Sequence, residues 1–132
     1  TKRAKQGYRW NSFHKIGVMM SFGTDWPVEP LDPRRGIYSS VERKNIENGK
    51  PENGWFPDEQ LSLADAVKYY TLGAAYGCFS EKKLGSLEKG KYADLTVFRG
   101  DMQAFAKKEK TKLLTMPVLL TMVQGKIVFR GE

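Results

Sequence analysis

The stretch SFGTDWPVEP at residues 21–30, followed by Asp32-Pro33, decides which fold we expect for this chain. It continues a short and mostly apolar run at residues 18–22, which is typical of a strand buried on both faces of a parallel sheet. The stretch then turns polar and places the carboxylate of Asp25 where this strand should end. In α/β barrels, the carboxyl ends of the strands carry the groups that do chemistry. Asp25 is therefore the first residue to consider as a functional group.

Two interpretations of Asp25 follow from the residues alone. The carboxylate can bind a metal ion, or it can accept a proton from a metal-bound water. Alternatively, Asp25 only caps the turn that follows, and Pro27 only shapes the loop. The local sequence favours the second interpretation, because a single acid after a strand is a weak signal.

Two helices are expected after this stretch. Asp32-Pro33 is typical of a helix start, with Asp as the N-cap and Pro at the first helical position, and Asn48-Gly49 would end this helix. Ser62 is the expected N-cap of a second helix, because an acid follows it at capping-box spacing. We therefore predict helices at about residues 33–48 and 62–78.

The last third of the chain is predicted to be rich in β-structure. Residues 95–98, 118–123 and 126–129 have the short apolar composition of strands, and Gln124-Gly125 between the last two is a hairpin signal. Three strands are marginally stable without a covering layer, so they should pack against a helix or another sheet. For the chain taken by itself, these elements predict an α+β arrangement.

The length and composition exclude several classes of protein. A chain of 132 residues is too short for a complete α/β barrel, which needs about 250 residues. One cysteine and one histidine cannot form a closed zinc site of the Cys/His type. No run of residues approaches the roughly 18 apolar residues of a membrane span. The chain begins at Thr1 rather than Met, so the gene product can start upstream.

The formal net charge is +7, and two basic segments carry much of it. These segments are solvated faces that keep the protein soluble, or they form a patch that binds phosphates. We favour solvated faces, because no base-reading or RNA-binding motif accompanies the charge. The alternative is a stand-alone basic module that binds nucleic acid or another acidic partner without catalytic activity. The segments comprise Lys2, Arg3, Lys5, Arg9 and Lys15, and Lys107, Lys108, Lys110 and Lys112 around Glu109.

Five stretches of the chain, taken in order, resemble amidohydrolase family 3, the YtcJ-like branch of the amidohydrolase superfamily. Residues 21–33 are similar to the last barrel strand of that family and the loop after it. IYSSVER at 37–43 and LSLADAVKYYTLGAAY at 61–76 resemble the next helices of the family. GSLEKGKYADL at 85–95 resembles the entry to the small C-terminal sheet, and TMVQGKIV at 121–128 resembles its closing hairpin. Each stretch taken alone is a weak match to the family, but the five stretches in this order are a specific one.

The resemblance implies a metal-dependent hydrolase of amides, cyclic amides or N-acyl compounds. The chain would be an α/β fragment: the last strand and helices of a TIM barrel, plus part of a small C-terminal β-sandwich. Asp25 matches the last-strand aspartate of the family, which contacts the metal and moves the proton of the attacking water. The resemblance also implies that Trp26 lines the same substrate pocket. The family's other metal ligands lie on earlier strands and are absent here, since the single histidine, His14, matches none of them.

The resemblance also fixes the expected domains and partners. Residues 1–80 would end the barrel, with the last strand at about 17–25, and residues 81–132 would form the β-rich subdomain. The complete enzyme would hold a divalent metal, expected to be zinc, and act on a small-molecule amide. The chain alone would hold none and be inactive, because one carboxylate holds a divalent metal poorly. We expect it to pair with the missing N-terminal part of the barrel or to self-associate through the exposed barrel strand, in the cytoplasm, without membrane or nucleic acid.

Three arginines belong to the first predicted helix. Arg34, Arg35 and Arg43 could meet an anionic substrate near the mouth of the barrel. Solvated helix charges are the simpler explanation for Arg34 and Arg35. Arg43 resembles a position where the family commonly has Arg, so we expect it to form a buried ion pair.

Overall fold

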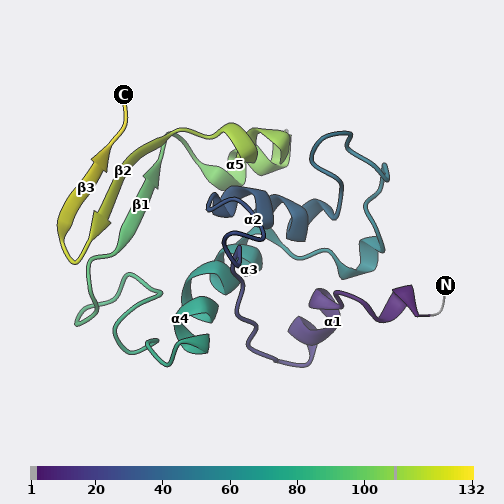
Figure 1. The fold of residues 1–132 in the computed structure, drawn as a ribbon, viewed down its shortest axis with the longest axis horizontal. Helices are drawn as coiled ribbons and strands as arrows, with labels where there is room; N and C mark the ends of the chain where they lie inside the picture. The colour runs from purple at the N-terminus through teal and green to yellow at the C-terminus, as the bar shows by residue number, and fades with distance from the viewer. Residues whose placement is uncertain (1–2, 109) are drawn as a thin grey trace.

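The computed structural model describes residues 3–108 and 110–132. Its helices occupy one part of the molecule and its strands the other, and the segment around α5 lies beside α2 (Figure 1). The elements are η1 (Ala4–Gln6), α1 (Trp10–Lys15), α2 (Pro33–Glu42), η2 (Pro57–Glu59), α3 (Leu63–Lys68), η3 (Tyr69–Gly73), α4 (Ala74–Gly77), β1 (Leu95–Phe98), α5 (Met102–Lys108), η4 (Lys110–Thr115), β2 (Val118–Val123) and β3 (Lys126–Arg130). This combination fits the expected α/β fragment. Lys2 and Glu109, named above for their charge, lie outside the described residues.

The three strands form one antiparallel sheet in the order β1-β2-β3. Leu95 pairs with Met122, and Val123 pairs with Lys126 next to the hairpin turn. Gln124 and Gly125 both have positive φ, at 49° and 77°, which is the backbone that a tight two-residue hairpin requires. The predicted strands and their hairpin are confirmed, with β3 extending one residue further than expected.

Helix α2 starts where the sequence predicts but ends earlier. The Asp32 carboxylate accepts the backbone N–H of Arg34 at 3.0 Å, and Pro33 occupies the first turn. The prediction that this helix extends to residue 48 is wrong, because the chain leaves the helix at Arg43. Arg43 has a left-handed backbone with a φ of 52°, and its N–H donates to the Ser39 carbonyl. That conformation ends a helix, as a left-handed C-cap does.

The second predicted helix is present, but it is not uniform. Ser62 is its N-cap, since its hydroxyl accepts the backbone N–H of Asp65 at 3.1 Å. The helical residues then run through α3, a π-helical turn η3, and α4. A π-helical turn inside an α-helix inserts an extra residue and is frequent at functional sites. Here the turn exposes the Tyr69 carbonyl to the N–H of Phe22, at 3.2 Å.

The strand predicted at about residues 17–25 is not formed in this structure. Residues 18–24 are assigned to no strand, and Val18 and Ser21 are exposed rather than buried. The physical reason is that a strand needs a hydrogen-bonded neighbour, and the described residues supply none here. Instead the segment packs on the helical layer. Gly73 lies so close that an added Cβ would be 2.1 Å from the Met20 carbonyl oxygen.

The buried core lies between α2 and α3. Ile37, Val41 and Ala66 form its centre, and Leu63 and Val67 pack against them. Their spacing gives each helix one apolar face, as the sequence predicts. The sequence did not predict α5 and η4, which interrupt the β-rich region that we expected at residues 81–132.

Candidate functional site

Asp25 lies on a tight turn directly after the extended segment 18–24. Its own backbone is left-handed, with a φ of 51°, a conformation that Asp tolerates better than most residues. The turn is closed by the Val28 N–H, which donates to the Asp25 carbonyl at 2.9 Å, and by the Glu29 N–H, which donates to the Thr24 carbonyl at 3.2 Å. Asp25 therefore shapes the turn with its backbone and still presents an exposed carboxylate. The two interpretations of Asp25 do not exclude each other.

The Asp25 side chain faces a cavity of about 250 Å³. The carboxylate folds back over Gly23, where an added Cβ would be 3.4 Å from Asp25 Oδ1. Aromatic walls and hydroxyl groups surround the acid, a composition suited to a small ligand with both apolar and hydrogen-bonding parts. The cavity is lined by Tyr8, Trp10, Ser21, Phe22, Gly23, Asp25, Gly36, Ser39, Ser40 and Tyr70.

Tyr70 reaches this cavity from the π-helical turn η3. Burial raises the pKa of its phenol, and the negative charges of Asp25 and Glu29 raise it further. The hydroxyl rests on α2 at Gly36, where an added Cβ would be 1.7 Å from the Tyr70 oxygen. Gly36 is thus the notch that admits Tyr70, and the phenol stays protonated, able to donate a hydrogen bond. The sequence did not single out Tyr70, because nothing local to it indicates a position beside Asp25.

Trp26 is placed differently from Asp25. Its side chain is 65% exposed, and it is not among the residues that line the Asp25 cavity. Trp26 follows Asp25 in the same turn, but it extends into solvent. The assignment of Trp26 to a substrate pocket stays a prediction.

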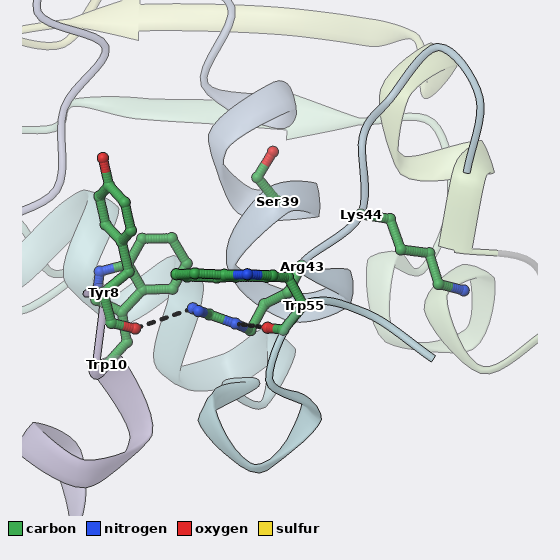
Figure 2. A pocket seen from close by; sticks show the side chains of 6 residues that line it. All are labelled: Tyr8, Trp10, Ser39, Arg43, Lys44 and Trp55. Carbon is green, nitrogen blue, oxygen red and sulfur yellow. Dashed lines mark hydrogen bonds between the residues drawn. The ribbon is translucent and has the colours of Figure 1, made fainter. Parts of the chain in front are cut away.

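Arg43 is buried, as expected, but it is held without the expected ion pair among the described residues. Its Nε donates to the Trp55 carbonyl at 2.5 Å, and its Nη1 donates to the Tyr8 carbonyl at 3.0 Å. The guanidinium lies 4.9 Å from the ring centroids of both Trp10 and Trp55, within cation–π range. Figure 2 shows it below the Trp55 ring, with Lys44 pointing away. Burial lowers the pKa of Arg43, against the opposing charge of Glu59.

His14 has a defined environment that the sequence did not reveal. Its Nδ1 lies 2.9 Å from the Tyr69 hydroxyl, and its Nε2 lies 3.7 Å from Asp65 Oδ2. The imidazole thereby joins α1 to α3 and to η3. The sequence could not reveal these contacts, because Tyr69 and Asp65 are 55 and 51 positions away in the chain.

The residues present do not make a metal site by themselves. Within residues 3–108 and 110–132, no group of three His, Cys, Asp or Glu side chains is placed to hold an ion. Asp25 supplies one carboxylate, and an open catalytic zinc site takes about three protein ligands. In the same part of the chain, no helix is long and apolar enough to cross a membrane.

Comparison with known proteins gives consistent matches. A model of the amidohydrolase family matches residues 1–129. YtcJ of Bacillus subtilis, named as an amidohydrolase, is 34% identical over 129 residues, which are 96% of this chain and 23% of that protein. The N-substituted formamide deformylase of Arthrobacter pascens is 30% identical over 109 residues, 83% of this chain and 19% of that enzyme. The chain spans about a fifth of the length of these relatives.

Two solved structures agree with these matches. An uncharacterized metal-dependent hydrolase from Pyrococcus furiosus is 34% identical, with a TM-score of 0.55 over 70% of this chain and 18% of that chain. An amidohydrolase from Thermotoga maritima has a TM-score of 0.62 at 22% identity, over 94% of this chain and 26% of that chain, and shows a likeness of fold alone. With nearly all of its residues inside the family match, the chain belongs to amidohydrolase family 3.

Proposed function

We propose that this chain is the C-terminal part of a metal-dependent amidohydrolase that cleaves amide or N-acyl C–N bonds outside peptides. The observation that carries the proposal is the family match over residues 1–129, within which Asp25 lies on a turn and faces a cavity. The name of the Arthrobacter relative, a deformylase of N-substituted formamides, supports this substrate class. A cytoplasmic site of action belongs to the same proposal.

The same proposal assigns the architecture. Residues 1–80 are the end of a TIM barrel, with residues 17–25 as its last strand, and residues 81–132 are part of a small β-sandwich. The fold likeness to the Thermotoga amidohydrolase supports this division. The extended segment also has the apolar composition of a barrel strand and packs on helices through Gly73. Its backbone becomes a strand when neighbouring strands pair with it.

Asp25 is the residue that we propose for the chemistry. An ionised carboxylate is an acceptor, so it can take a proton from the water that attacks the amide carbon. It can return that proton to the departing nitrogen, which leaves as an amine. Trp26, in the same turn, presents a large apolar surface that could contact the substrate.

A metal centre in the complete enzyme is part of the proposal, with zinc as the expected ion. The described residues do not fit such a centre alone, because they offer one suitable carboxylate and no cluster of ligands. The remaining ligands would have to come from outside this chain. We therefore expect these 132 residues to be inactive when expressed alone.

The experiment compares the protein at the full length that its gene encodes with its Asp25→Asn variant. We expect kcat/KM on an N-acyl amine to fall by about 100-fold or more, the usual contribution of a general base, with an unchanged Tm. Glu52→Gln, a neutralised acid on an exposed loop that lines neither cavity, is the control and should keep its activity. Full activity in Asp25→Asn would contradict the role of Asp25. Salt-dependent nucleic-acid binding by a full-length protein without hydrolase activity would instead favour the basic binding module.

A further inference from the structure

The three arginines of the α2 region have three different environments. Arg34 is fully engaged: its guanidinium donates to both carboxylate oxygens of Asp32 and, through Nη1, to the Met116 carbonyl at 2.6 Å. Arg43 is enclosed by two tryptophan rings and two carbonyls. Arg35 and Arg43 each have one buried nitrogen without a partner, Arg35 Nε and Arg43 Nη2. Arg35 differs because none of its side-chain nitrogens has a hydrogen bond or ion pair to any residue that the structure describes, whereas Arg43 Nε and Nη1 donate to carbonyls. Among the described contacts, Arg35 is therefore the arginine of the three whose whole guanidinium is unengaged, and it lines the cavity next to that of Asp25, which Arg43 does not.

Arg35 lines a cavity of about 620 Å³ that adjoins the Asp25 cavity. Gly23, Gly36 and Tyr70 line both cavities, so the two spaces meet at these residues. A ligand with one functional group beside Asp25 can therefore extend toward the Arg35 guanidinium. Tyr70 lines both cavities, and its hydroxyl fits the notch at Gly36.

The charge of Arg35 is poorly compensated by its own helix. It lies in the first turn of α2, which contains no acidic residue, and the helix dipole there disfavours a cation and favours an anion. The nearby Asp32 carboxylate also attracts Arg35, but it accepts its side-chain hydrogen bonds from Arg34, and these are the main cause that lowers the pKa of Asp32. A bound anion would satisfy both the guanidinium and the dipole.

The other charges around this cavity do not replace such an anion. Lys44 lines the cavity but is paired with Glu42, at 3.0 Å. Glu29 and Glu47 also line it, but both are exposed, so water and salt screen their charges. Arg35 is half-buried and therefore keeps the strongest attraction for a ligand that enters the cavity.

We infer that Arg35 binds a carboxylate group of the substrate, which makes the substrate class amides or N-acyl compounds that carry a carboxylate. A guanidinium binds a carboxylate through two parallel hydrogen bonds, which fix the ligand's direction as well as its charge. This inference rests on the proposed function, because that function places the amide beside Asp25. The inference adds Arg35 as the residue that binds the carboxylate end of the substrate.

The test measures binding by calorimetry on the protein at the full length that its gene encodes. The probe is 4-oxopentanoate, in which a ketone replaces an amide, so that it cannot be hydrolysed. The matched ligand is 5-methyl-2-hexanone, in which an uncharged isopropyl group has the shape of the carboxylate. We expect the first to bind and the second to bind at least about tenfold more weakly, the value of a charged hydrogen bond.

Variants assign the difference to Arg35. Arg35→Gln should weaken 4-oxopentanoate binding about tenfold, and Arg35→Lys, which keeps the charge but loses the fork, should weaken it less. Arg130→Gln removes the same charge from the exposed strand β3 and should leave binding unchanged. Unchanged Tm values show that each variant folds.

Each other result overturns the inference. Equal binding of the two ligands, wild-type affinity in Arg35→Gln, or an equal loss in Arg130→Gln would each exclude a carboxylate site at Arg35. Because the probe is not hydrolysed, the outcome does not depend on turnover. A full-length enzyme that hydrolyses uncharged amides but fails this test keeps the proposed function and loses the Arg35 site.

Discussion

Arg43 joins three parts of the chain through a single side chain. Its guanidinium donates to the carbonyls of Tyr8 and Trp55 and lies 4.9 Å from the ring centroids of both Trp10 and Trp55 (Figure 2). Its backbone also ends α2 in a left-handed conformation. The planar guanidinium suits this arrangement, because a lysine ammonium cannot lie flat against a ring while it donates to two separate carbonyls.

Arg43→Lys should therefore destabilise the protein although the charge is kept. We expect a loss of about 2 kcal/mol, since two hydrogen bonds from a charged donor and the ring stacking are disturbed. Urea unfolding followed by tryptophan fluorescence measures this loss. Arg130→Lys on the exposed strand β3 is the control and should stay within about 0.5 kcal/mol of wild type. Equal stability of Arg43→Lys and wild type would mean that the fork is dispensable.

For single residues, the sequence predicted which ones have structural or functional roles better than it predicted what they contact. Asp25, Arg43 and Ser62 could be singled out because strand ends, helix positions and caps have local signatures. His14 and Tyr70 could not, because their partners lie 51 to 55 and 34 positions away in the chain. Such contacts depend on how helices pack and leave no local pattern.

The helical segment α3–η3–α4 is held against residues 18–22 by close backbone approach rather than by a strand ladder. An added Cβ at Gly73 would meet the Met20 carbonyl oxygen at 2.1 Å, and one at Gly77 would meet Ser21 Oγ at 2.6 Å. The first obstacle is backbone and cannot rotate away. The second is a small side chain that can be removed.

This difference predicts unequal effects of two similar substitutions. Gly73→Ala should cost about 2 kcal/mol or more, because the extended segment must shift, whereas Gly77→Ala should cost less. Adding Ser21→Gly should restore stability to Gly77→Ala. Denaturant midpoints of the variants measure these effects. A stabilised Gly73→Ala, as expected for an unhindered helix position, would show that the segment does not pack here.

Glu42 ties the end of α2 to η4. Its carboxylate pairs with Lys44 at 3.0 Å and with Lys110 from η4. Burial raises the pKa of Glu42, but the hydrogen bonds from Lys110 and Lys44 outweigh that effect and leave the pKa below its ordinary value of 4.5. A carboxyl with a lowered folded pKa stabilises the folded state above its unfolded pKa and loses that contribution as the pH falls through the folded value.

We therefore expect the stability difference between wild type and Glu42→Gln to depend on pH. The difference should be constant from neutral pH down to about 5, then shrink as the pH falls from there through the lowered folded pKa. Urea unfolding at a series of pH values measures it, and subtraction of the two curves removes the other carboxylates. A difference that does not change with pH would mean that the Lys44 and Lys110 pairs add no stability.

Elements were predictable where their ends carry local chemistry. The caps at Asp32 and Ser62 and the Gln124-Gly125 turn are found where expected. The end of α2 was missed because Arg43, not a glycine, adopts the left-handed conformation. α5 and η4 were missed because the lysine-rich sequence there has no clear period, and the π-helical turn has no signature in a single sequence.

For the molecule as a whole, the exposed apolar surface is the dominant property. Ile16 is 74% exposed, Val28 79% and Phe79 94%, and the extended segment at residues 18–22 pairs with no strand among the described residues. Apolar patches and unpaired edges promote association. This agrees with a chain that matches only about a fifth of its relatives.

We expect these residues, expressed alone, to self-associate through the segment at 18–22. Sedimentation velocity should show species larger than a monomer that grow with concentration. Val18→Lys should reduce association by placing a charge on the free edge. Val28→Lys, on the exposed turn after Asp25, is the control and should reduce it less. A monomer at all concentrations, or equal effects of the two variants, would contradict association through this segment.

The fit of the Tyr70 hydroxyl into the notch at Gly36 constrains how the sequence can evolve. Any side chain at position 36 would overlap the phenol, whose oxygen lies 1.7 Å from the position of a Cβ. A smaller residue at position 70 leaves only a gap, which a protein tolerates more readily than overlap. Lineages that replace both residues should therefore have lost the tyrosine first, and the two positions should co-vary among homologues.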